Sequence, residues 1–64
     1  MTSAEFVTEQ NKIVLRKQED SSWLIEIYLI SHSMQEMEKR INVGTYDTAY
    51  LYVYENYIKK RAVG

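Results

Sequence analysis

The sequence predicts an α+β domain in which a three-stranded antiparallel sheet packs on one C-terminal helix, in the order β-β-β-α. Three observations predict this fold: an alternating apolar segment at residues 23–30, a β-branched segment on each side of it, and an unbroken amphipathic segment at residues 49–61. The 64 residues contain no proline and two glycines, so no linker divides them. We expect one small domain at residues 12–64, preceded by a weakly ordered arm at residues 1–11.

The clearest predicted strand covers residues 23–30. With a period of two residues, one face of it is wholly apolar and is expected to face the core. The residues of that face are Trp23, Ile25, Ile27 and Leu29. The opposite face mixes Glu26 with apolar side chains, so it is either half covered or a contact surface.

Two further strands are expected on either side of this one. Residues 12–17 form the first, which enters a hairpin through the polar residues 18–22. Residues 39–43 form the third, because they alternate polar and apolar and end at Gly44. Residues 33–36 have the pattern of a capping box, and Met34 and Met37 have helical spacing. We expect residues 31–38 to be a long loop or one helical turn.

The C-terminal helix is expected to begin at an N-cap formed by Asp47 or Thr48. Cations at residues 59–61 suit the C-terminal end of its dipole. Glu55 and Lys59 are spaced and ordered for an i, i+4 ion pair. At 100° per residue, one broad apolar arc contains Ala49, Tyr50, Val53, Tyr54, Tyr57 and Ile58.

Composition excludes several classes of protein. Eight basic and nine acidic residues give a net charge of −1, so no overall basic field exists. Without cysteine there is no disulfide framework or thiolate metal site, and the single histidine, His32, excludes a multi-histidine zinc site. The apolar run at residues 23–30 is far shorter than the ~20 residues of a membrane span. With no signal-peptide pattern at the N-terminus, we expect a cytoplasmic location and no membrane contact.

No catalytic motif is present. The sequence lacks a phosphate-binding glycine loop, a H-E-x-x-H pattern and a cysteine nucleophile. We therefore expect no enzymatic activity, no cofactor, no metal and no small-molecule substrate.

Five of the six tyrosines lie within residues 46–57. Tyrosine joins a large apolar area to a polar tip and is favoured at interfaces for that reason. Two or three of them are expected to pack on Trp23 and the apolar strand face. The remainder indicate an interaction surface.

The basic residues form three small clusters, at residues 12–17, 39–40 and 59–61. If the first two clusters lie on neighbouring strands, Arg16 and Arg40 share the solvent face of the sheet with Gln18, Tyr28 and Asn42. Arginine matches guanine and phosphate, and asparagine or glutamine matches adenine, so such a face suits DNA. An ordinary solvated sheet face explains the same residues equally well.

Two segments carry a family resemblance. Residues 23–27 read Trp-Leu-Ile-Glu-Ile, and residues 39–49 read Lys-Arg-Ile-Asn-Val-Gly-Thr-Tyr-Asp-Thr-Ala. Over residues 12–60 the chain resembles the plant ethylene-response-factor type DNA-binding domain and the arm-binding domains of phage and transposon integrases. The resemblance implies a three-stranded sheet across one helix and DNA contacts from Arg16, Gln18, Glu26, Tyr28, Arg40, Asn42 and Thr45. The family is more basic and its helix is alanine-rich, whereas this helix is rich in tyrosine.

Two functional hypotheses follow. The first is a small non-catalytic module, of a regulatory or mobile-element protein, that lays its sheet on duplex DNA, as a monomer or a homodimer. Its DNA-binding residues would be Arg16, Gln18, Tyr28, Arg40, Asn42 and Thr45. The alternative is a protein-interaction module or small phage-type inhibitor. Its interface would be Leu24, Tyr28, Ile30, Tyr50, Tyr52 and Tyr54.

Overall fold

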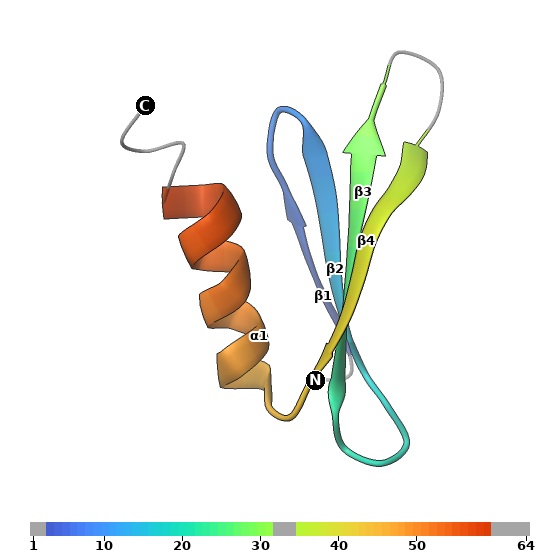
Figure 1. The fold of residues 1–64 in the computed structure, drawn as a ribbon, viewed down its shortest axis with the longest axis vertical. Coiled ribbons are helices and arrows are strands. Elements are labelled where there is room, and N and C mark those ends of the chain that lie inside the picture. Colours follow the sequence, from blue (N-terminus) through green and yellow to red (C-terminus); the bar gives the residue numbers. More distant parts are fainter. Residues whose placement is uncertain (1–2, 32–34, 60–64) are drawn as a thin grey trace.

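A computed structural model describes residues 3–31 and 35–59, which form a four-stranded antiparallel sheet and one helical segment (Figure 1). The strands follow one another in space as they do in sequence, so the sheet is a meander. Their bounds are β1 Ser3–Val7, β2 Asn11–Lys17, β3 Trp23–Ile30 and β4 Gln35–Val43. The helical segment consists of α1, Tyr46–Val53, continued by the π-helical turn η1, Tyr54–Ile58. The α+β class and the C-terminal helix agree with the prediction.

The predicted number of strands is wrong by one, because residues assigned to an N-terminal arm form β1. This strand pairs antiparallel with β2, from Ser3 opposite Arg16 to Val7 opposite Lys12. Ala4 and Phe6 are half-buried against the core, while the alternate residues Ser3, Glu5 and Val7 are exposed. Five residues with two such anchors give too short an alternation to recognise in the sequence. Packing of these two side chains against the core, and of Phe6 against Tyr50, stabilises the strand instead.

The central strand β3 has the predicted bounds, and three of its four expected core residues are buried. Trp23, Ile25 and Ile27 belong to the core, whereas Leu29 is 42% exposed. The cross-strand partners of Leu29 are Asn11 and Glu36, both of which are polar. The apolar face therefore ends at Ile27, and the prediction for Leu29 is wrong.

Strand β4 starts earlier than predicted and contains a bulge. Residues 35–38 are strand rather than loop or helical turn, whereas residues 32–34 lie outside the described residues. Ile27 is opposite Lys39 but Tyr28 is opposite Met37, so Glu38 is the extra residue. A bulge shifts the two-residue period by one position, which hides the strand in a pattern search.

The helix begins before the predicted N-cap. Thr45 caps it, and its hydroxyl accepts a hydrogen bond from the Thr48 backbone N–H at 3.1 Å. Because β4 runs to Val43, only two residues separate strand and helix, and the cap falls on Thr45 rather than on Asp47 or Thr48. The predicted Glu55–Lys59 ion pair is present at 3.6 Å.

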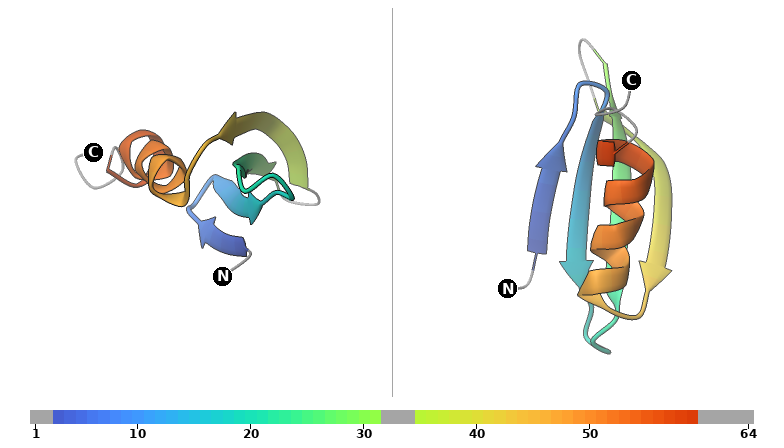
Figure 2. Two further views of the ribbon diagram at one scale, coloured as in Figure 1. Left: turned by 90° about the horizontal axis from the view of Figure 1, so that it is seen from below. Right: turned by 90° about the vertical axis from the view of Figure 1, so that its left-hand side faces the viewer.

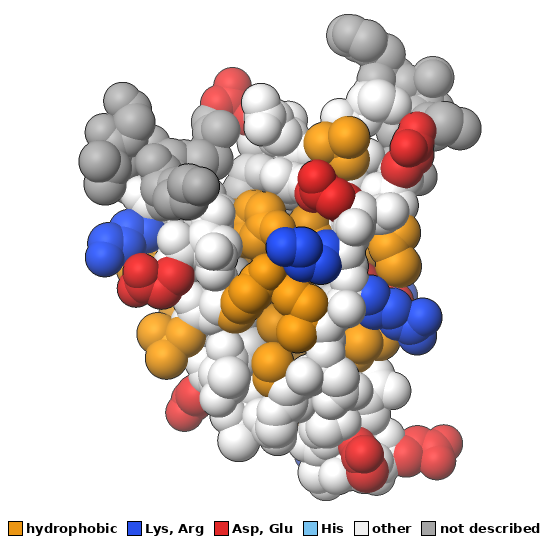
Figure 3. Space-filling model, in the orientation of Figure 1, with side chains coloured by type: hydrophobic (Ala, Val, Ile, Leu, Met, Phe, Trp, Pro, Cys, Tyr) orange, Lys and Arg blue, Asp and Glu red, His pale blue; other side chains and the backbone are white. Residues whose placement is uncertain are grey.

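One face of the sheet packs on the helix, and we call it the inner face. Figure 2 shows α1 lying along this face, in front of β2 and β3, with β1 on one side and β4 on the other. Apolar side chains gather at this junction in the space-filling view (Figure 3). The fully enclosed core consists of Ile13, Leu15, Trp23, Ile25, Ile27, Ala49 and Val53. As expected, three tyrosines pack against this core: Tyr46, Tyr52 and Tyr57.

Candidate functional site

The opposite face, which we call the outer face, has no described helix packed on it. Strand alternation and register place its side chains in three rows that cross the sheet from β1 to β4. The rows are Ser3–Arg16–Leu24–Asn42, Glu5–Val14–Glu26–Arg40 and Val7–Lys12–Tyr28–Met37. The structure thus brings four of the six predicted DNA-binding residues onto one surface: Arg16, Tyr28, Arg40 and Asn42.

The centre of this face is an ion pair. The Arg16 Nε donates a hydrogen bond to the Glu26 Oε1 at 2.8 Å. The Glu26 side chain is 11% exposed and that of Arg16 is 55% exposed. The hydrogen bond and then the charge of Glu26 raise the pKa of Arg16 above its ordinary value. The pair therefore fixes the guanidinium on the sheet and leaves most of it in solvent.

Arg40 lies on the other side of the same carboxylate. It is directly opposite Glu26 in the β3–β4 register, on the strand that β3 separates from β2. Its side chain is exposed, and Glu26 between the two arginines lowers their mutual repulsion. Two cations therefore flank one buried anion across the three neighbouring strands.

A hollow of about 520 Å³ opens beside this ion pair. Its floor is Val14, which is 8% exposed although it faces outward. The lining residues are Ser3, Ala4, Glu5, Lys12, Val14, Arg16 and Tyr28. Two of the predicted residues, Arg16 and Tyr28, share this hollow. Ser3 and Glu5 belong to β1, which was not predicted, so the sequence did not indicate their place in this hollow. The two-residue spacing of Lys12, Val14 and Arg16 was the signal available in the sequence for the β2 side.

The remaining predicted residues lie elsewhere. Gln18 and Asn42 line a second hollow, of about 370 Å³, at the β2–β3 hairpin. Glu19 and Asp20 line the same hollow, and two carboxylates disfavour a phosphate there. Hydrogen bonds from the Ser22 hydroxyl and backbone N–H hold the pKa of Asp20 below its ordinary value. Thr45 lies at the helix start, where its hydroxyl serves as the cap.

The predicted protein interface is divided between two sides of the sheet. Leu24 and Tyr28 belong to the outer face, as does Ile30 by alternation, whereas the three tyrosines belong to the helix on the inner face. The three tyrosines also lie on different sides of the helix. The rings of Tyr50 and Tyr54 stack with their centroids 6.4 Å apart, whereas Tyr52 packs against Tyr57 on another flank. These six residues do not form one continuous surface.

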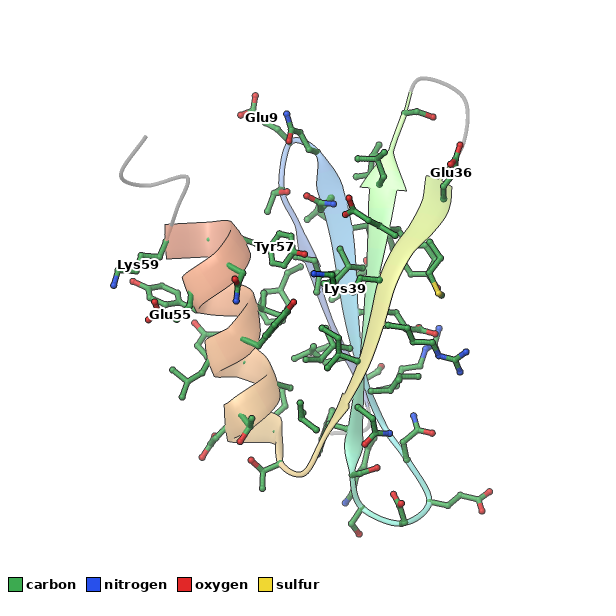
Figure 4. All side chains as sticks on the ribbon, in the orientation of Figure 1. Glu9, Glu36, Lys39, Glu55, Tyr57 and Lys59 are labelled. Carbon is green, nitrogen blue, oxygen red and sulfur yellow. The ribbon has the colours of Figure 1, made fainter. Side chains whose placement is uncertain are left out.

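The flank with Tyr52 and Tyr57 faces a lysine. Figure 4 shows Lys39 of β4 and Tyr57 of the helix pointing toward each other. Lys39 Nζ donates a long hydrogen bond of 3.5 Å to the Tyr52 hydroxyl, which raises the pKa of Lys39 together with the charges of Tyr52 and Tyr57. Burial raises the pKa of Tyr57. This cluster closes the upper end of the helix–sheet junction.

Metal ligands and membrane-spanning helices are further features that could indicate a function. Residues 3–31 and 35–59 contain no cluster of three or more potential metal ligands. No helix in these ranges is long and apolar enough to cross a membrane. Comparison with protein-family models, curated proteins and solved structures found no match for the chain.

Proposed function

We propose that this protein is a non-catalytic DNA-binding module that lays the outer face of its sheet on duplex DNA. The observation that carries the proposal is the placement of Arg16 and Arg40 on either side of buried Glu26, on a sheet face with no described helix against it. Glu26 limits the freedom of Arg16, so less conformational entropy is lost when the guanidinium meets a phosphate or a guanine.

The shape of the surface supports the same proposal. A two-stranded ribbon fits the major groove, and β2 and β3 are the strands at the centre of this face. Tyr28 and Asn42 add a hydroxyl and an amide, which are hydrogen-bonding groups suited to phosphates and base edges. The resemblance described above implies the same face.

The charge of the face sets the strength of binding. Its rows contain three cations, Lys12, Arg16 and Arg40, and two carboxylates, Glu5 and Glu26. So small an excess gives modest affinity, and binding should weaken steeply with salt.

The test measures binding to a random-sequence duplex by fluorescence anisotropy at several salt concentrations. The variant R16A/R40A is compared with K39A/K59A, which removes the same charge from side chains that are not on the outer face. We expect the first variant to bind the duplex much more weakly, though measurably at low salt, and the second to keep the wild-type affinity. The dependence of log affinity on log salt should fall by about 1.8 in the first variant if each arginine neutralises one phosphate. Equal losses in both variants, or no binding by the wild-type protein at low salt, contradict the proposal.

A second candidate function is protein binding through the stacked tyrosines. Tyr50 is 40% exposed and Tyr54 38% exposed, and Leu51 beside them is 58% exposed. Exposed aromatic and apolar side chains grouped in this way are typical of protein contacts. The simplest form of this function is a homodimer, which light scattering of the wild-type protein and of Y50A/Y54A tests. A dimer mass for wild type and a monomer mass for the variant support the homodimer. A monomer mass for both proteins contradicts it.

A further inference from the structure

We propose that the hollow between β1 and β2 holds a backbone phosphate of the bound duplex, with Lys12 and Arg16 as its cationic ligands. The inference rests on the proposed DNA-binding function and adds a phosphate site to it. It also assigns a role to β1, the strand that the sequence did not reveal.

The two cations lie on one face of β2 and border the same hollow. Lys12 and Arg16 are four residues apart on one face of β2, which separates their Cα atoms by roughly 13 Å. Val14 lies between them and forms the floor of the hollow. Both cationic side chains therefore reach the same hollow from its two ends.

The Arg16 guanidinium keeps hydrogen-bond donors available for an anion in the hollow. Glu26 accepts from Nε of Arg16, and no hydrogen bond to another described residue uses the two terminal nitrogens of that guanidinium. These two nitrogens are free to donate to phosphate oxygens, as arginine does at phosphate sites. Tyr28 lies directly opposite Lys12 in the β2–β3 register and lines the same hollow as Arg16. Tyr28 is thus placed to donate a further hydrogen bond to the same anion.

Glu5 also lines the hollow and forms an ion pair with Lys12. Glu5 Oε2 lies 3.5 Å from Lys12 Nζ, and its side chain is 56% exposed. An exposed ion pair of this kind is weak, so a row of backbone phosphates can displace the carboxylate. Glu5 then acts as an internal competitor that lowers affinity for the duplex.

A backbone phosphate fits better than a free small anion. The hollow is open on the same face as Arg40 and is continuous with the rows that cross the sheet. A duplex lying on this face carries one phosphate charge per ~1.7 Å of its axis, so it offers phosphates at the hollow and at Arg40 together.

The chain offers an internal control for the experiment. The Glu55–Lys59 pair has nearly the same separation, 3.6 Å, and lies on the helix (Figure 4). We compare E5Q with E55Q, and K12M with K59M, in the anisotropy titration with duplex DNA over a range of salt. Each substitution within a comparison changes the net charge equally. Thermal unfolding of every variant establishes that it is folded.

We expect E5Q to bind about threefold more tightly than wild type, because Lys12 is released from its competitor. K12M should bind about fivefold more weakly, and its salt dependence should fall by about 0.9, the value for one phosphate. E55Q and K59M should stay within about twofold of wild type, since they lie off the surface.

Three outcomes overturn the inference. If E5Q matches E55Q and K12M matches K59M while R16A/R40A still binds much more weakly than wild type, the hollow holds no phosphate but the proposed function stands. If no form of the protein binds the duplex, both fail. If inorganic phosphate alone shifts the amide resonances of Val14 and Tyr28 but the duplex does not, the hollow is a small-anion site rather than a DNA contact.

Discussion

Arg16 and Glu26 form a hydrogen-bonded ion pair in which the anion is buried and the cation is exposed. Nε and Oε1 are 2.8 Å apart, and the side chains are 55% and 11% exposed respectively. A buried charge that loses its partner is costly, whereas an exposed charge that loses its partner is rehydrated. The two members of the pair therefore differ in what their removal does to the fold.

This asymmetry gives the first prediction. R16M should lower the melting temperature more than E26Q does, because R16M leaves a buried carboxylate without its cation. E26Q removes the buried charge and keeps an oxygen that accepts from Nε. Thermal unfolding at pH 7 followed by circular dichroism measures both, with R40M as the control for loss of an arginine on the same face. A greater loss in E26Q than in R16M contradicts the asymmetry.

A second prediction concerns the contribution of β1 to stability. Phe6 is half-buried against the core, and its ring lies 5.8 Å from that of Tyr50. F6A should reduce the free energy of unfolding by about 2 kcal/mol, less than for a fully enclosed phenylalanine. V7A, next to it on the exposed side, should change it by less than about 0.5 kcal/mol. Urea unfolding measures both variants, and equal values would show that β1 is not anchored through Phe6.

The sequence identifies strand β3 but not strand β1. Residues 23–30 were located correctly because eight residues with a strictly apolar alternate face identify a strand. β1 was missed because its anchors, Ala4 and Phe6, are recognisable only once the core and the Tyr50 ring against which they pack are known. The hollow beside β1 was missed with it.

The start of β4 was hidden for a different reason. The bulge at Glu38 breaks the two-residue period, and the spacing of Met34 and Met37 imitates a helix. The sequence predicted a shared face for Arg16 and Arg40 only if their strands lay in the same part of the sheet. The alternation of side chains is local, but the pairing of strands is tertiary and needed the structure.

A third prediction separates the structural role of Thr45 from the DNA contact that the sequence predicted for it. T45A should reduce stability by about 1 kcal/mol, because the first turn of α1 loses the oxygen that accepts from the Thr48 N–H. T45S keeps that oxygen and should restore most of the loss. Urea unfolding gives the stability, and anisotropy gives the DNA affinity. If T45S has normal stability but weak DNA binding, the threonine methyl group contacts DNA.

The fourth prediction is a dependence on pH that arises at the β2–β3 hairpin. Asp20 accepts hydrogen bonds from the Ser22 hydroxyl at 2.6 Å and the Ser22 backbone N–H at 3.0 Å. These bonds lower the pKa of Asp20 in the folded protein, the side-chain bond more than the backbone bond. Because the folded pKa lies below the unfolded value of about 3.9, the carboxylate contributes stability above that pH. The contribution is lost as the pH falls through the folded pKa.

Wild type should therefore be more stable than D20N at pH 6, and the difference should shrink below about pH 4 and vanish in stronger acid. Urea unfolding at about pH 6, 4 and 2.5 measures the difference directly. E19Q removes the same charge one residue away and is the control for the change in net charge. S22A removes the hydroxyl that donates to Asp20. In the S22A background the effect of D20N should be smaller, because the stronger of the two bonds is gone. A difference that persists unchanged at the lowest pH would mean that the side-chain shape of Asp20, and not its charge, stabilises the hairpin.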